Sequence, residues 1–137
     1  MAKIEGGCLC GKIRYESDAD PAMQAICHCK TCQKNSGSAY SLNVAVPADS
    51  LSVRGETLTL YVDRSGASGQ EFHRHFCSIC GSHIYAGGPA YGPLSFIKVG
   101  TMDDPSWVEP NTHIWTAEKM PCVEIPADAA QFPANPG

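Results

Sequence analysis

Seven of the eight cysteines in this chain fall into three short clusters. The clusters are Cys8-Leu9-Cys10, Cys27-His28-Cys29 followed by Cys32, and Cys77-Ser78-Ile79-Cys80. Thiolates are preferred ligands of zinc. A structural zinc site takes four protein ligands, whereas a catalytic site takes three and keeps one position open. Seven thiols divide into four plus three, and this predicts one zinc site of each kind.

Disulfide bonds are the alternative use of clustered cysteines. Cysteine makes up 8 of the 137 residues, which is below the roughly 8–10% of a disulfide scaffold, and a chain of this length can bury a core of its own. Residues 1–7 contain no apolar run resembling a signal peptide, and no segment approaches the roughly 18 apolar residues of a membrane span. We therefore expect metal ligands in a reduced, cytoplasmic protein without a membrane partner.

Charge and length narrow the function classes further. The formal net charge is −4 and the ten Lys and Arg residues are spread singly, whereas proteins that bind a phosphate backbone normally show a basic face or stripe. We therefore expect no nucleic-acid partner. Length predicts one domain over residues 1–120, followed by an irregular C-terminal tail over residues 121–137, where the sequence becomes rich in Ala and Pro.

Two of the clusters are suited to sharing one ion. On an extended strand, residues two apart point to the same face, so Cys8 and Cys10 could present both sulfurs together. A tight turn would bring Cys77 and Cys80 together, and Gly81 tolerates the backbone angles that such a turn needs. The four thiols predict a structural zinc site that joins distant segments, so that metal affinity becomes folding free energy. Buried cysteine pairs without a metal are the alternative.

The remaining cluster offers three thiols, those of Cys27, Cys29 and Cys32, and this predicts a zinc site with an open fourth position. His28 would point to the opposite face of the strand and is expected to be a packing residue. A redox alternative exists, because two cysteines three apart near a helix start can have a lowered thiol pKa and cycle as a disulfide. The usual βαβ setting for that chemistry is absent from this sequence.

The elements that must position these thiols are mainly strands. Apolar and polar residues alternate along much of the chain, which predicts a mainly β protein. A single short helix is expected over residues 29–36, ending at Gly37, a residue type that commonly closes a helix in the left-handed conformation. The expected strands cover residues 11–16, 39–46, 57–62, 71–76, 83–86, 94–99 and 112–116.

The cysteine motifs and their flanking residues resemble one known family. They are Gly6-Gly7-Cys8-Leu9-Cys10-Gly11, Cys27-His28-Cys29-Lys30-Thr31-Cys32 with Ser36-Gly37, and Phe76-Cys77-Ser78-Ile79-Cys80-Gly81-Ser82. This pattern is similar to that of the glutathione-dependent formaldehyde-activating enzymes, whose domain also occurs in centromere protein V. The resemblance covers about residues 6–115, including residues 99–105 and 110–114. Residue 33 departs from the pattern, because it is Gln33 where arginine is frequent in the family.

The resemblance implies a fold of packed, twisted antiparallel sheets stapled by zinc, like that of zinc-binding Rab exchange factors. It also implies one structural and one catalytic zinc. The structural ion would be held by Cys8, Cys10, Cys77 and Cys80, and the catalytic ion by Cys27, Cys29 and Cys32.

The activity implied by the resemblance is that of a carbon–sulfur lyase acting on S-hydroxymethylglutathione, the adduct of glutathione and formaldehyde. The open zinc position would bind the thiol, lower its pKa and present the thiolate to the aldehyde. The partner would be a small-molecule thiol such as glutathione. The sequence leaves open two other classes, a zinc-stabilised protein-binding module without catalysis and a thiol–disulfide redox protein. It also leaves open the proton donor and the oligomeric state.

Several further residues are candidates for the same site. Glutathione carboxylates call for cations, and none of the available ones stands out. His73 and His75 alternate along one predicted strand, His113 fits the family pattern and could line the pocket, and Cys122 is either a free thiol or a fourth ligand for the three-cysteine site. The candidate cations are Lys30, Lys34, Arg54, Arg64 and Arg74.

Overall fold

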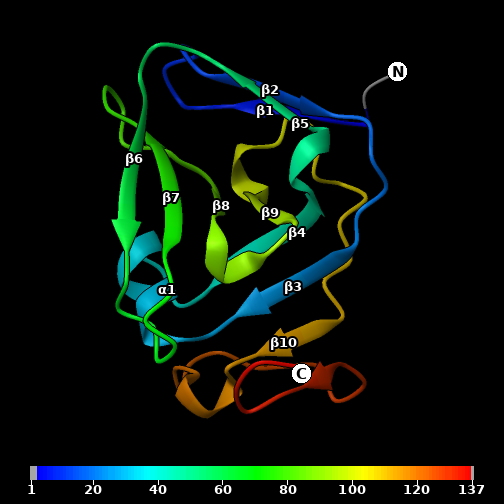
Figure 1. Cartoon of the computed structure of the whole chain (residues 1–137). Coiled ribbons are helices and arrows are strands. Elements are labelled where there is room, and N and C mark those ends of the chain that lie inside the picture. Colours follow the sequence, from blue (N-terminus) through cyan, green and yellow to red (C-terminus); the bar gives the residue numbers. More distant parts are fainter. Residues whose placement is uncertain (1–2, 137) are drawn as a thin grey trace.

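A small antiparallel sheet covers one side of a larger sheet. The computed structural model of the chain describes residues 3–136. The small sheet has the strand order β1-β2-β5, and in Figure 1 it lies across the top of the molecule. Its strands are β1 (Ile4–Gly7), β2 (Arg14–Ser17) and β5 (Leu51–Arg54).

The larger sheet is strongly curved and has the strand order β11-β10-β3-β4-β9-β8-β7-β6. Every pairing in it is antiparallel except those of β10, which runs parallel to both β3 and β11. The fold is therefore mainly β with one mixed sheet, which differs at this edge from the purely antiparallel arrangement expected. A long connection separates β9 from β10, so no hairpin dictates the direction of β10. The strands are β3 (Met23–Cys27), β4 (Ser41–Pro47), β6 (Leu58–Asp63), β7 (Phe72–Cys77), β8 (His83–Gly87), β9 (Leu94–Lys98), β10 (Thr112–Ile114) and β11 (Ala130–Gln131).

Helix α1 spans Lys30–Ser36 and follows β3. The sulfur of Cys29 caps its first turn by accepting a hydrogen bond from the Cys32 N–H at 3.2 Å. Gly37 ends it in the left-handed conformation, with φ 65°, as the sequence predicted. Four short 3₁₀ helices complete the fold: η1 (Ala48–Ser50), η2 (Pro89–Tyr91), η3 (Val99–Thr101) and η4 (Thr116–Glu118).

Four strands were not expected from the sequence, namely β1, β3, β5 and β11. Two physical reasons account for β1 and β3. Strand β1 contains Gly6 and Gly7, and glycine does not favour strands by itself. Three consecutive residues of β3 are buried, and a strand covered on both faces lacks the alternation that identifies strands from sequence.

The hydrophobic core lies between the two sheets. Ile4 and Tyr15 from the small sheet meet Val44 and Ile97 from the large one, and each is at most 2% exposed. Burial of a side chain of this size stabilises the fold by roughly 1.5–3 kcal/mol. The remaining members are Cys8, Ile13, Val46, Cys77, Ile84, Val99 and Met102. Two cysteines of different clusters thus belong to the same core.

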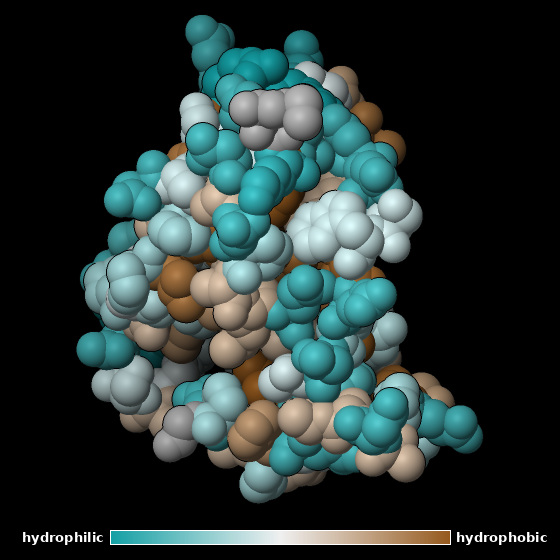
Figure 2. Space-filling view, turned by 90° about the vertical axis from the view of Figure 1, so that its right-hand side faces the viewer, coloured by the Kyte–Doolittle hydropathy of each residue, from teal (hydrophilic) through white to brown (hydrophobic). Residues whose placement is uncertain are grey.

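The C-terminal segment folds back along β10. Strand β11 pairs with β10, and the Trp115 N–H donates to the Ala134 carbonyl at 3.1 Å. Figure 2 shows that the face on the right of Figure 1 is mostly hydrophilic, with hydrophobic residues visible mainly between polar ones. Across residues 3–136, no helix combines the length and apolar character that a membrane crossing requires.

Candidate metal sites and their surroundings

The first cysteine pair lies in the loop of the β1–β2 hairpin. Cys8 follows the last residue of β1, and Cys10 is in a turn, so the expected extended strand through both residues is wrong. Instead, the Gly11 N–H donates to the Cys8 carbonyl at 3.1 Å, and Gly11 has φ 82°. A turn is needed here because the strand must reverse to pair β2 with β1, and glycine adopts this backbone conformation without strain.

The second pair lies in the loop of the β7–β8 hairpin, which contains a similar glycine turn. Cys77 ends β7, and the Gly81 N–H donates to the Cys77 carbonyl at 2.8 Å. Gly81 has φ 78°, so the glycine has the role expected from the sequence. Two hairpin loops of similar construction therefore face each other, although the sulfurs of Cys10 and Cys77 belong to residues 67 positions apart.

The four sulfurs of these loops form one compact group, all within 4.8 Å of one another. The sulfurs of Cys8 and Cys10 are 3.5 Å apart, and those of Cys10 and Cys77 are 3.8 Å apart. Four sulfurs placed tetrahedrally at about 2.3 Å from zinc would be separated by about 3.8 Å. The donor set therefore fits a closed tetrahedral zinc site.

Hydrogen bonds around this group favour ionised sulfur at its C-terminal half. The Thr57 hydroxyl lies 3.3 Å from the Cys77 sulfur and lowers the pKa of that thiol. The side chain and backbone of Ser82 lower the pKa of Cys80 to about 5. Thiolate is the form that binds metal, so these contacts prepare two of the four ligands.

The second group contains three sulfurs, those of Cys27, Cys29 and Cys32, again within 4.8 Å of one another. Cys27 ends β3, Cys29 caps α1 and Cys32 lies in the first turn of the helix. Cys27 and Cys32 are buried, whereas Cys29 is partly exposed. The group is thus reached from the side of Cys29.

Electrostatics within this group favour a thiolate at Cys32. Hydrogen bonds from the Cys27 and Cys29 thiols lower the pKa of Cys32, and these contacts, with one from Ser41, outweigh the opposing effect of burial. The pKa of Cys27 is raised, because its thiol is a hydrogen-bond donor in the cluster and because it is buried. Three sulfurs within 4.8 Å of one another, one of them readily ionised, fit a three-thiolate zinc site.

The loop that holds this cluster is fixed by side chains from both of its flanks. The Gln33 amide donates to the carbonyls of His28 and Glu118, at 2.9 and 3.0 Å. The Glu118 carboxylate accepts from the Lys30 N–H at 2.7 Å. Gln33, which differs from the frequent family residue, therefore ties α1 to the 3₁₀ helix η4.

His28 and His113 form a buried pair behind the cluster. The His28 Nε2 and His113 Nδ1 atoms are 2.9 Å apart, and the rings are stacked. The His28 N–H also donates to the Ile114 carbonyl at 3.0 Å. Neither histidine belongs to a group of metal-binding geometry among residues 3–136, so His28 packs against β10, as expected for a residue outside the ligand set.

A polar cluster occupies the face of the large sheet opposite the core. We define the Lys98 cluster as Ser41, Asn43, His83 and Lys98. The Lys98 ammonium donates to the Asn43 side-chain oxygen at 2.8 Å, and the Asn43 amide donates to the Ser41 hydroxyl at 3.0 Å. Ser41 lies directly opposite Cys27 in the pairing of β4 with β3. Hydrogen bonds therefore lead from Lys98 to Ser41, the cross-strand partner of one cysteine of the three-sulfur group.

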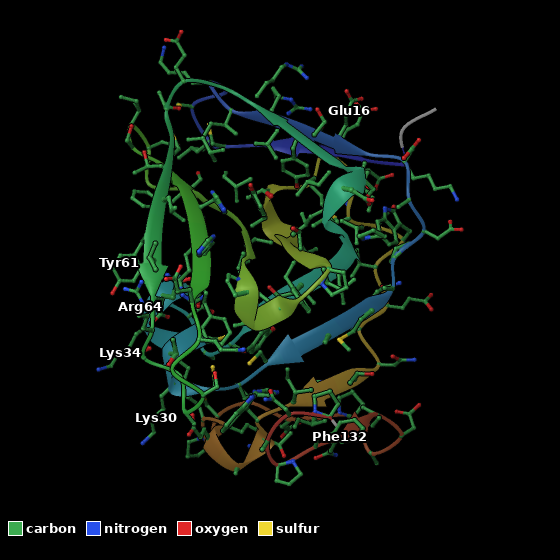
Figure 3. The ribbon with its side chains drawn as sticks, in the orientation of Figure 1. Glu16, Lys30, Lys34, Tyr61, Arg64 and Phe132 are labelled. Carbon is green, nitrogen blue, oxygen red and sulfur yellow. The ribbon has the colours of Figure 1, made fainter. Side chains whose placement is uncertain are left out.

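Most of the cations considered from the sequence point into solvent rather than toward the sulfur groups. Figure 3 shows Lys30, Lys34 and Arg64 pointing outward from the molecule, and Arg54 is also exposed. Arg74 is buried, and its Nε donates to the Asp63 carboxylate at 2.8 Å. It is paired within the fold rather than free for a ligand.

The other candidates occupy separate places. His73 is 2.9 Å from the Glu71 carboxylate, and His75 stacks on Tyr85 with ring centroids 4.2 Å apart. Cys122 is exposed and does not join either sulfur group.

Sequence reasoning missed Lys98, Asn43 and His83. A signal was available, because Ser41, Asn43 and Lys98 are the polar positions that alternate with Leu42, Val44 and Ile97. Alternation in neighbouring strands places such residues on one face. Finding that these strands are neighbours, with Asn43 paired to Lys98, required the tertiary structure.

These features define a class, a small mainly β protein with a four-thiol and a three-thiol group suited to binding metal. Comparison with known families narrows the class. The family model described as "Glutathione-dependent formaldehyde-activating enzyme" matches residues 3–118. The chain belongs to this family.

Individual relatives support this placement. A Halomonas elongata protein is 29% identical over 126 residues, covering 89% of this chain and 80% of its own length. Relatives from Penicillium rubens and Fusarium vanettenii are each 30% identical, covering 79% and 73% of this chain but only 56% and 59% of their own length. All three are provisionally named glutathione-dependent formaldehyde-activating enzymes.

A solved structure supports the fold alone. The crystal structure of a Rhodobacter sphaeroides protein matches with a TM-score of 0.56 at 18% identity, covering 93% of this chain and 98% of that one.

Proposed function

We propose that the chain is a zinc-dependent carbon–sulfur lyase that forms or cleaves a thiol–aldehyde adduct such as S-hydroxymethylglutathione. The observation that supports this most is the contrast between the two sulfur groups, one with four donors and one with three. A four-donor set suits a closed structural site, and a three-donor set suits a site with a place for a substrate. Family membership points to glutathione and formaldehyde as the substrates.

In this proposal Cys8, Cys10, Cys77 and Cys80 hold the structural zinc, and Cys27, Cys29 and Cys32 hold the catalytic one. Zinc bound at the three cysteines would supply Lewis acidity that lowers the pKa of a substrate thiol. The chemical step itself is simple. The thiolate sulfur adds to the carbonyl carbon, a C–S bond forms, and the carbonyl π electrons move to the oxygen, which then takes up a proton.

The residues of the chain contribute binding and positioning. The partly exposed Cys29 marks the side from which a thiol arrives. Gln33 holds the cysteine loop in place, which matters because misplacement of a catalytic group slows a reaction strongly. Lys30 and Lys34 project from α1 beside the cluster and would meet the carboxylates of glutathione at the surface.

The same proposal has consequences for setting and organisation. The ligands must be thiolates, so the protein would work in a reducing compartment such as the cytoplasm. The zinc-binding unit would span residues 1–120, with residues 121–137 as a C-terminal extension. Its partner would be a small-molecule thiol rather than nucleic acid or a membrane.

The test measures zinc content and thiol response together. Zinc per chain is determined for the wild type, for Cys29→Ala and for Cys122→Ser, a control that alters an exposed cysteine outside both groups. We expect about two ions in the wild type and the control, and one in Cys29→Ala. Glutathione should change the visible spectrum of the cobalt-substituted wild type, and the protein should speed the interconversion of S-hydroxymethylglutathione measured by NMR exchange.

Two other outcomes would favour the rival functions. Tightly held metal without any response to glutathione would support a zinc-stabilised protein-binding module. Loss of metal on mild oxidation, with a reversible Cys29–Cys32 disulfide, would support a thiol–disulfide redox protein.

A further inference from the structure

The thiol–aldehyde reaction needs a group that receives the negative charge formed on the aldehyde oxygen, and the Lys98 cluster contains such a group. Strands β4 and β9 pair so that Asn43 lies opposite Lys98. On the other side of β4, Cys27 lies opposite Ser41. Paired residues share a face of the sheet, so a thiol ligand, Ser41, Asn43 and Lys98 all lie on the face opposite the hydrophobic core.

Lys98 is held in this position by its hydrogen bond to Asn43 and has further donors to offer. An ammonium group carries three N–H donors. Within residues 3–136, the Nζ of Lys98 has one hydrogen-bond acceptor, the side-chain oxygen of Asn43. Burial lowers the pKa of Lys98, and the sulfurs of Cys32, Cys27 and Cys29 act against this and favour the ammonium form. The charge of Lys98 and the sulfur group therefore lie within electrostatic reach of each other.

His83 adds an independent observation at the same place. Both of its ring nitrogens are buried, and neither has a hydrogen-bond partner in the described part of the chain. Burial, together with the charges of Lys98 and Arg74, lowers the pKa of His83 to about 3. A neutral imidazole has one donor and one acceptor nitrogen. Leaving both buried without a partner is costly, which points to a polar ligand that these atoms would meet.

The surroundings of Lys98 favour a compact ligand. Phe96 lies two residues before Lys98 on the same strand, and its ring packs on Tyr91 with centroids 4.5 Å apart. Arg74 is already paired with Asp63, whereas the ion pairs within residues 3–136 give Lys98 no carboxylate partner. A single oxygen bearing developing charge matches one ammonium group better than a planar carboxylate of a large substrate does.

We propose that Lys98 is a catalytic residue that binds the aldehyde oxygen next to the three-cysteine site and protonates it as the C–S bond forms, with His83 contacting the same substrate oxygen. The inference rests on the proposed function. As the thiolate sulfur adds to the carbonyl carbon, the π electrons move to the oxygen, and Lys98 transfers one proton to it. The resulting amine regains a proton from water. In the cleavage direction the amine takes the hydroxyl proton while the C–S bond breaks and the carbonyl re-forms.

The test combines kinetics with binding of a stable anion. The variants are Lys98→Met, which removes the charge at similar length, Lys98→Arg, which keeps it, and Lys3→Met, a control at an exposed lysine that lies next to the small sheet and pairs with Asp20. Zinc content and circular dichroism establish that each variant is folded and loaded. Formate is the binding probe, because it presents a charged oxygen on a one-carbon skeleton, and its affinity for the glutathione-saturated protein is measured by calorimetry.

We expect Lys98→Met to lower kcat for adduct interconversion by about a hundredfold or more, as removal of one donor to a developing oxyanion does. Formate affinity should fall by about tenfold or more, the value of a hydrogen bond to a charged group. Glutathione affinity at the cobalt-substituted site should stay within about twofold of the wild type. Lys98→Arg should recover part of the formate affinity, and Lys3→Met should match the wild type in both measurements.

The outcomes separate this inference from the proposed function. If the wild type does not accelerate the reaction, the proposed function is wrong and the inference is wrong with it. If the wild type is active and Lys98→Met has the same kcat and formate affinity, only the role of Lys98 is refuted. If Lys98→Met does not fold, Lys98→Arg is the deciding variant. An unchanged kcat in Lys98→Arg, together with a lack of competition between formate and formaldehyde in the wild type, would refute the inference.

Discussion

The four-sulfur group should stabilise the fold by joining two distant hairpin loops. The exposed Cys10 is the best position to test this, because its replacement by serine removes one thiol ligand and little packing. Serine does not ionise near neutral pH and cannot replace the thiolate. Cys122→Ser is the matched control, since that thiol is exposed and outside both groups.

The size of the effect follows from the length of chain that the site closes. The sulfurs of Cys10 and Cys77 are separated by 67 residues in sequence. The chain-entropy relation for a cross-link of that loop length gives about 15 cal/mol/K, which is about 4 kcal/mol at 25 °C. A metal bound there would act as the cross-link, because its ligands are brought together only in the folded state.

The assay is urea unfolding of each protein in the zinc-loaded form and again with a strong chelator. The difference between these two free energies of unfolding should be larger in the wild type than in Cys10→Ser by about 4 kcal/mol. The three-cysteine group is intact in both proteins, so its contribution cancels. Cys122→Ser should behave like the wild type. If chelation affects Cys10→Ser as strongly as the wild type, the four-cysteine cross-link does not exist.

Three other predictions concern buried polar groups. Asp63→Asn should lower the free energy of unfolding by about 3–5 kcal/mol, because it leaves Arg74 buried without its partner, whereas Asp49→Asn at an exposed site should change it little. The folded-state pKa of His83 is about 3, below its unfolded value of about 6.5. The free energy of unfolding should therefore fall as the pH is lowered from 6.5 toward 3. In the wild type this loss should exceed that of His83→Gln by up to about 1.4 kcal/mol per pH unit. Gln33→Leu should lower the free energy of unfolding in urea by about 1–3 kcal/mol, because it removes two hydrogen bonds to carbonyls. An unchanged unfolding midpoint would show that these two hydrogen bonds do not stabilise the fold.

The two sulfur groups are built from different local elements. The four-thiol group lies between two hairpin loops, each closed by a glycine in the left-handed region. The three-thiol group lies between a strand end and a short helix whose first turn is capped by one of the sulfurs themselves. Each group has a member that solvent reaches, Cys29 in the three-thiol group and Cys10 in the four-thiol group. The number of sulfur donors, rather than their exposure, therefore distinguishes the two groups.

Lys98 differs from the surface lysines in its solvation and in how firmly its side chain is held. The surface lysines of α1 are solvated, and their contribution to binding is screened by water and salt. Lys98 is partly desolvated and anchored by Asn43, so its field is stronger and its direction is fixed before a substrate arrives. If it acts on the reaction, it does so without the cost of reorganisation.

Composition and spacing alone determined the division of seven cysteines into four and three, the mainly β character, and the helix over residues 29–36 with its closing Gly37. These properties are local, since ligand spacing, alternation and capping act over a few residues. Even so, the backbone of the first pair was predicted wrongly. A strand and a turn can both bring Cys8 and Cys10 together, and only the pairing of β1 with β2 decides between them.

The tertiary structure alone decided which polar side chains face the three-cysteine group. Asn43 and Lys98 are 55 positions apart in sequence, and they meet because β4 and β9 are neighbours in one register. A shift of that register by one residue would turn Lys98 into the hydrophobic core and Ile97 out of it. Such long-range pairing depends on the burial of the whole sheet, which no local pattern in the sequence specifies.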